Sequence, residues 1–111
     1  MQPVVKKFIF SSLLAFTTLL VASFLWNKPA VATILLAGLS VLMLLVEWKK
    51  QNLILYLFAF VSGPIAEAIA IHFGTWSYGH PSIAGIPLWL PFVWGNSSLY
   101  IIRVKALLDL L

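Results

Sequence analysis

The stretch Leu53–His72, LILYLFAFVSGPIAEAIAIH, decides the fold class, because its only charged side chain is Glu67. A transmembrane helix needs about 20 predominantly apolar residues, and this stretch has that length. A carboxyl group in the hydrocarbon core of a bilayer is costly unless it is neutral, paired or hydrated. Glu67 is therefore the first candidate functional residue.

Three further apolar runs have comparable length and cover residues 8–26, 29–46 and 86–102. The 111 residues are 62% hydrophobic and 9% charged, with a mean hydropathy of +1.04. A soluble domain is about 45–50% apolar and about 25% charged, so this chain lacks the polar residues for a soluble surface. We predict an all-α integral membrane protein of the cell membrane, with four transmembrane helices in a single multi-pass domain over residues 1–111.

Two of the runs have alternative interpretations. In the fourth, Pro91 would break a helix that had already begun, so either the helix is kinked or residues 86–90 are a non-helical lead-in buried against protein. The first run follows Lys6-Lys7 and resembles a signal peptide. It is longer than a signal core, and the second run overlaps the cleavage-like site at residues 30–32, so we expect it to be retained.

The basic residues predict the orientation. Six of them fall on one side of a four-span arrangement: Lys6, Lys7, Lys49, Lys50, Arg103 and Lys105. Lys28 alone falls on the other side, where the loop 73–85 has no Lys or Arg. The positive-inside rule places both termini in the cytoplasm and this loop outside. Basic residues at the edges of apolar runs are topology signals, and we expect no nucleic-acid partner.

Small residues in the third run predict how it packs. A stripe at four-residue spacing contains Ser62, Ala66, Ala70 and Gly74, and an adjacent ridge contains Ala59, Gly63 and Glu67. Small residues let a neighbouring helix approach closely. We therefore expect the stripe to be a helix contact and Glu67 to point toward a helix. Pro64, one turn before Glu67, is expected to kink this run.

The fourth run carries polar residues within an apolar segment. Trp89, Asn96 and Arg103 recur at seven-residue spacing, and Ser97 and Ser98 follow Asn96. Residues spaced in this way share one helix face. If this cluster faces Glu67, the third and fourth spans enclose a polar pocket that opens outward.

Each candidate group has a simpler interpretation. Glu67 is either a structural hydrogen-bonding group, a proton-transfer group or a lipid-facing side chain. His72 and His80 lie eight residues apart, which is a weak metal pattern; we expect interfacial histidines, with neither metal nor cofactor. The chain has no cysteine, so thiolate metal sites and disulfides are excluded. Trp and Tyr in the outer loop are also typical of a membrane interface.

The region from Phe73 to Trp94 contains F-G-T-W-S-Y followed by A-G-I-P-L-W-L-P-F-V-W. It resembles membrane carotenoid-biosynthesis proteins, namely carotenoid hydratases and, more distantly, lycopene cyclase domains, and also small prokaryotic membrane proteins without a characterised activity. The matching positions are Phe73, Gly74, Trp76, Tyr78, Gly85, Pro87, Leu88 and Trp94, with Glu67 as the preceding acid. The hydratases are longer, and the cyclase domains carry two acidic residues where this chain has Trp89-Leu90.

The resemblance implies a site for a lipophilic, isoprenoid- or carotenoid-like substrate. Glu67 is the expected proton donor for hydration or cyclisation of a double bond. The expected substrate-binding residues are Trp76, Tyr78, Trp89, Trp94 and Asn96. The ring faces of Trp76, Tyr78 and Trp94 would stabilise a carbocation. We expect membrane lipids around the chain and either a homo-oligomer or a partner membrane protein. A proton-coupled small transporter and a non-catalytic accessory subunit are the alternatives.

Overall fold

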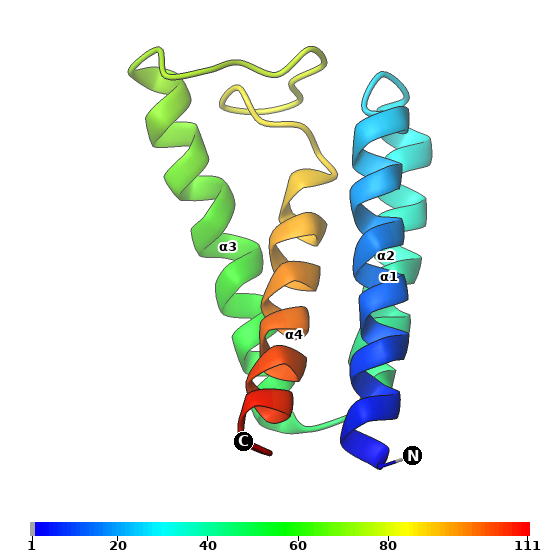
Figure 1. The fold of residues 1–111 in the computed structure, drawn as a ribbon. Helices are drawn as coiled ribbons and strands as arrows, with labels where there is room; N and C mark the ends of the chain where they lie inside the picture. Colours follow the sequence, from blue (N-terminus) through cyan, green and yellow to red (C-terminus); the bar gives the residue numbers. More distant parts are fainter. Residues whose placement is uncertain (1) are drawn as a thin grey trace.

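The computed structural model describes residues 2–111, which form four α-helices: α1 (Pro3–Leu25), α2 (Pro29–Val46), α3 (Lys50–His72) and α4 (Leu90–Leu108). The turn between α1 and α2 and the long loop 73–89 lie at one end of the bundle (Figure 1). Both termini and the turn between α2 and α3 lie at the other end. The all-α class is confirmed, and α1, α2 and α3 are each long and apolar enough to cross a membrane.

The fourth helix differs from the expected span 86–102. It begins at Leu90 and ends at Leu108, and Pro91 lies in its first turn, where the missing N–H leaves no helix bond unmade. Residues 86–89 are the non-helical lead-in, with Ile86 and Trp89 buried. Because α4 extends to Leu108, it also contains Arg103 and Lys105 and is less apolar than the other helices.

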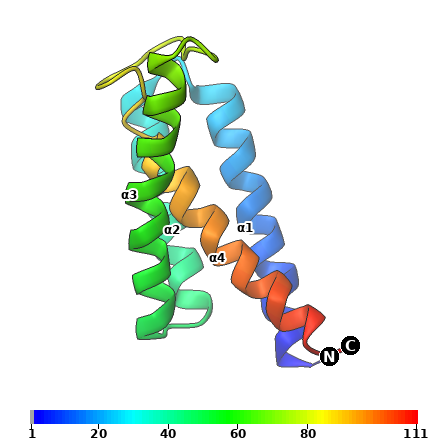
Figure 2. The same cartoon turned by 90° about the vertical axis from the view of Figure 1, so that its left-hand side faces the viewer.

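The helix α4 is the centre of the bundle. It packs against α1, α2 and α3, whereas α3 packs mainly on α4. Figure 2 shows α4 crossing the bundle obliquely, with α3 on one side and α1 on the other. A helix covered by three neighbours needs less apolar surface than one that faces lipid, which explains how α4 tolerates its polar residues.

A chain of buried hydrogen bonds takes one side chain from each helix. Tyr56 Oη donates to Ser40 Oγ at 2.7 Å, and Ser40 Oγ donates to Asn96 Oδ1 at 2.6 Å. Asn96 Nδ2 donates to Thr18 Oγ1 at 3.2 Å. All four side chains are buried. Buried polar groups that are fully paired specify a unique packing, so this series of hydrogen bonds fixes the register of all four helices.

An ionic cluster ties the opposite end together. The carboxylate of Glu47, just after α2, lies 2.9 Å from Lys7 Nζ, 2.8 Å from Lys49 Nζ and 2.8 Å from Arg103 Nη1. Hydrogen bonds from Lys49, Arg103 and Lys7, in that order, hold the pKa of Glu47 well below its usual range. Arg103 is buried, so its charge is neutralised within the protein. The cluster places basic residues of α1, the α2–α3 turn and α4 at one end, as the sequence predicted.

The small-residue stripe is not the contact face of α3, which corrects the prediction. Ala66 and Gly74 are exposed, and Ser62 and Ala70 are only half-buried, whereas Gly63 on the adjacent ridge is buried. A Cβ built on Gly63 would lie 2.1 Å from Cδ2 of Trp94, so only glycine lets the indole ring lie against the backbone. Gly74 instead ends α3 with a positive φ of 84°, the usual glycine termination of a helix.

We predict that Gly63→Leu destabilises the protein by about 1–3 kcal/mol, the usual cost of overpacking, because the new side chain displaces Trp94. Ala66→Leu is the matched control, one turn along the same helix on its exposed face, and should leave stability unchanged. Thermal unfolding of both variants in mild detergent measures the difference. Equal stability of the two variants would contradict the assignment of the contact face.

Candidate functional site

The carboxyl group of Glu67 joins three segments of the chain. Glu67 is half-buried in the last two turns of α3. Its Oε1 accepts a hydrogen bond from the hydroxyl of Tyr78 in the loop 73–89, and its Oε2 accepts one from the indole N–H of Trp94 in α4. Glu67 thus points toward protein, as the ridge position predicted, and connects the loop and α4 to α3.

The position of Trp94 follows from local helix geometry. Trp94 lies in the second turn of α4, and its ring covers the backbone of Gly63. Gly63 and Glu67 are four residues apart and share one face of α3. The ring therefore packs on the first while its N–H reaches the carboxyl group of the second. An indole N–H can only donate, so this contact requires an acceptor at Glu67.

A tight turn returns the outer loop to the bundle. Ala84 and Gly85 both have positive φ, 52° and 82°, as a type I′ turn requires. The N–H of Ile86 donates to the carbonyl of Ile83 at 2.9 Å, which closes the turn. A Cβ on Gly85 would lie 2.7 Å from a methyl group of Ile71 in α3. Glycine is thus needed there both for its φ and for the close approach.

The phenol of Tyr78 is a stable hydrogen-bond donor. Burial, and then the hydrogen bond to Glu67, raise the pKa of Tyr78 well above its usual value. The phenol therefore stays protonated over the working pH range and supplies its proton to the bond with Glu67. The ring of Tyr78 also meets the ring of Trp89 edge to face, with centroids 6.0 Å apart.

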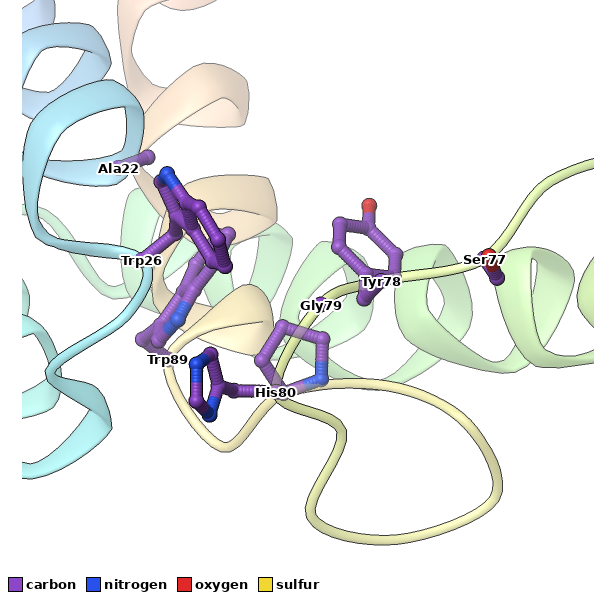
Figure 3. Close-up of a pocket in the computed structure, with 8 residues that line it drawn as sticks. Ala22, Trp26, Ser77, Tyr78, Gly79, His80 and Trp89 are labelled. Atoms are coloured by element: carbon purple, nitrogen blue, oxygen red, sulfur yellow. The ribbon is translucent and has the colours of Figure 1, made fainter.

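A pocket of about 310 Å³ opens beside Tyr78 at the loop end of the bundle. Its lining residues come from the end of α1, the outer loop and the lead-in to α4: Ala22, Trp26, Ser77, Tyr78, Gly79, His80, Pro87 and Trp89 (Figure 3). Glu67 is not among them and lies behind Tyr78, to which it is hydrogen-bonded. The pocket lining is therefore mainly aromatic. The carboxyl group of Glu67 is connected to it only by the hydrogen bond to the Tyr78 hydroxyl.

The predicted site residues separate into two groups. Tyr78 and Trp94 contact Glu67, and Trp89 contacts Tyr78. Trp76 is an exposed loop residue. Asn96 is bonded to Thr18 and Ser40 instead of facing Glu67, so the expected single polar pocket between α3 and α4 does not form.

The neighbouring serines do not join Glu67 either. Ser97 and Ser98 bond to the carbonyl groups of Val93 and Gly95 in their own helix. A hydroxyl that bonds to the preceding helical turn needs no partner from another segment. The polar residues 96–98 of α4 therefore stabilise the helix bundle and take no part in the site around Glu67.

The pocket includes two rings that sequence reasoning did not select, Trp26 and His80. Trp26 ends α1 and is far from the aromatic loop in sequence; its only signal was its position at the edge of an apolar run. Its ring lies 5.4 Å from that of His80. His72 instead contacts Phe73, so the two histidines lie in different surroundings. Within residues 2–111, no group of three His, Asp or Glu side chains gathers at one place.

Comparison of the chain with models of protein families, with curated proteins and with solved structures found no match. The interpretation of the site therefore depends on its geometry and chemistry. The resemblance to carotenoid-biosynthesis proteins stays a prediction.

We predict that Glu67→Gln folds with nearly the parent stability. The Gln oxygen can accept from Trp94, and its amide can donate to the Tyr78 hydroxyl, which is able to accept. Glu67→Leu keeps the approximate size but leaves both partners unpaired, which should cost about 1–3 kcal/mol. Thermal unfolding in detergent compares the three proteins. A Leu variant as stable as the parent would show that the two hydrogen bonds do not hold this region together.

Proposed function

We propose that the chain is a four-span membrane protein with both termini in the cytoplasm. Three helices have the length and hydropathy of spans, and α4 lies among them with the charge of Arg103 paired to Glu47. The six basic residues near the termini and the α2–α3 turn, against Lys28 alone at the other end, favour this orientation. The aromatic loop then faces outward.

Single cysteines at Ser77 and Gln51 test this topology, because the chain has no cysteine of its own. In intact cells, a membrane-impermeant thiol reagent should label Ser77→Cys and not Gln51→Cys. The reagent should label both after the membrane is opened. Labelling of both positions from outside the intact cell would exclude the four-span arrangement.

The function that the geometry supports best is binding of a lipophilic small molecule, of the isoprenoid-like class, in the aromatic pocket. The observation that carries the proposal is a pocket of about 310 Å³ lined mainly by aromatic and apolar side chains at the loop end. Ligand sites are typically apolar clefts of about 300–1,000 Å³ with few polar groups. Here the lining includes the polar side chains of Ser77, Tyr78 and His80, and the hydroxyl of Tyr78 is held by Glu67.

Acid-catalysed chemistry on the bound molecule is a second candidate, favoured by the contact between Tyr78 and Glu67. Protonation of a carbon–carbon double bond would give a carbocation, which ring faces stabilise. Addition of water and loss of a proton would complete a hydration; attack by a second double bond would move the positive charge to another carbon, and loss of a proton from a neighbouring carbon would complete a cyclisation. Both oxygens of Glu67 accept hydrogen bonds in the structure, so acid catalysis requires that Glu67 first binds a proton. Tyr78 would then either pass its own proton to the ligand while it receives that of Glu67, or move aside.

Mass spectrometry of lipids retained by the purified protein tests binding. We expect an isoprenoid-like lipid to co-purify with the parent and with the control Ala66→Leu. The amount of retained lipid should fall at least about tenfold in Ala22→Leu, because the larger side chain narrows the pocket. Loss of the burial of even part of the ligand lowers the binding free energy by over about 1.4 kcal/mol, which corresponds to this factor. A lipid content independent of Ala22 would contradict a ligand site here and leave the accessory-subunit alternative.

The same preparations separate binding from chemistry. If Glu67 transfers a proton, Glu67→Gln should retain the ligand but lose the hydrated or cyclised product, since general acid catalysis contributes about 10²–10⁴-fold. A product formed equally by Glu67→Gln would remove the acid from the mechanism. Ligand movement that requires a proton gradient, without any new product, would support the transporter alternative.

A further inference from the structure

Four aromatic rings from three separate segments line this open pocket. Trp26 follows α1, Tyr78 and His80 belong to the outer loop, and Trp89 precedes α4. Figure 3 shows the side chains of Trp26, Trp89 and His80 gathered on one side, with Tyr78 opposite. Trp26 and His80 are exposed, as rings at a membrane interface are, but Trp89 is 5% exposed and Tyr78 is half-buried. Burial of the last two rings distinguishes the pocket from a belt of exposed rings.

Contacts with the loop hold these rings in position. Trp26 lies directly on the backbone of Gly79, where an added Cβ would come within 2.4 Å of its ring. Trp26 is also tilted against His80, and Tyr78 meets Trp89 edge to face. The indole N–H of Trp89 is buried without a partner, so its ring contacts, and not a hydrogen bond, position it. The ring faces are thus arranged before any ligand enters.

The residues that line the pocket include no Lys, Arg, Asp or Glu. Residues 73–89 contain no Lys, Arg, Asp or Glu. Behind the ring of Tyr78, the carboxyl group of Glu67 accepts the phenol hydrogen bond, which increases electron density on that ring. Lys28 is exposed in the α1–α2 turn; it is the single Lys or Arg at this end of the described chain. An anion would find no cationic side chain on the pocket wall.

We propose that the pocket binds a quaternary ammonium group. Ring faces attract such cations through their quadrupoles, and aromatic cages are a recurrent way to recognise them. The volume of about 310 Å³ accommodates a trimethylammonium group and the beginning of an attached chain. The inference rests on the proposed function only for the existence of a ligand site at this pocket, and it assigns a molecule with a quaternary ammonium group in place of the isoprenoid-like class. The ligand is either a soluble quaternary amine or the head group of an amphiphilic lipid.

Choline and its uncharged carbon isostere, in which a tert-butyl group replaces trimethylammonium, form the decisive probe pair. Equilibrium dialysis of radiolabelled choline against the full chain in a neutral maltoside detergent measures affinity, with the isostere as competitor. We expect saturable choline binding and competition by the isostere that is at least about tenfold weaker, as expected for a desolvated cation–π contact. A purely hydrophobic pocket would give the reverse order, because the isostere carries no charge to desolvate.

Variants at the two ends of the bundle locate the binding. Trp26→Leu should weaken choline binding about tenfold, and Trp26→Phe, which keeps an aromatic face, should weaken it less. Trp48→Leu is the matched control, because Trp48 is an exposed tryptophan at the opposite end, and should bind choline like the parent. Lys28→Gln should bind more tightly, because a like charge is removed. Unchanged affinity in Trp26→Leu would overturn the proposal.

Nanodiscs separate the two sources of the cation. If a lipid head group occupies the pocket, phosphatidylcholine discs should suppress binding of free choline, and phosphatidylethanolamine discs should not. Equal binding in both would indicate a soluble amine. Tighter binding of the isostere than of choline would overturn the cation proposal and leave the lipophilic pocket intact. Failure of both probes, together with a lipid content independent of Ala22, would contradict both proposals.

Discussion

Two hydrogen bonds to the carboxyl group of Glu67 hold together the end of the bundle that carries the loop 73–89. One bond comes from the loop through Tyr78 and the other from α4 through Trp94. Within this part of the bundle α3 packs mainly on α4, so Glu67 is the polar link that brings the loop back over the helices. Since Tyr78 forms a wall of the aromatic pocket, the site depends on an acid that does not line it.

Other polar groups stabilise the helix bundle away from the loop 73–89. Asn96 takes part in a buried chain of hydrogen bonds with one side chain from each of the other helices, and Glu47 gathers basic residues at the end with the termini. These two groups fix helix register and close the end that carries the termini (Figure 1). The pocket lies at the opposite end, and most of its walls come from connecting segments, where binding sites commonly lie.

The sequence predicted the helix bundle well because apolar length and charge position are local properties. The α2 boundaries followed from apolar length, and the direction of Glu67 toward protein followed from its position on the ridge of α3. The start of α4 was ambiguous, because Pro91 fits either a kink or a first turn. The partner of Asn96 and the role of Trp26 depend on contacts between distant segments, which periodicity within one helix cannot specify.

Hydrogen exchange of the loop tests most directly whether Glu67 holds the loop end of the bundle together. The amides of Ser82, Ile83 and Ile86 are hydrogen-bonded in the turn, so they exchange when the loop opens. Glu67→Leu should accelerate their exchange relative to the parent and Glu67→Gln, while amides in the middle of α1 and α2 exchange as before. Equal exchange of the turn in all three proteins would contradict the central role of Glu67.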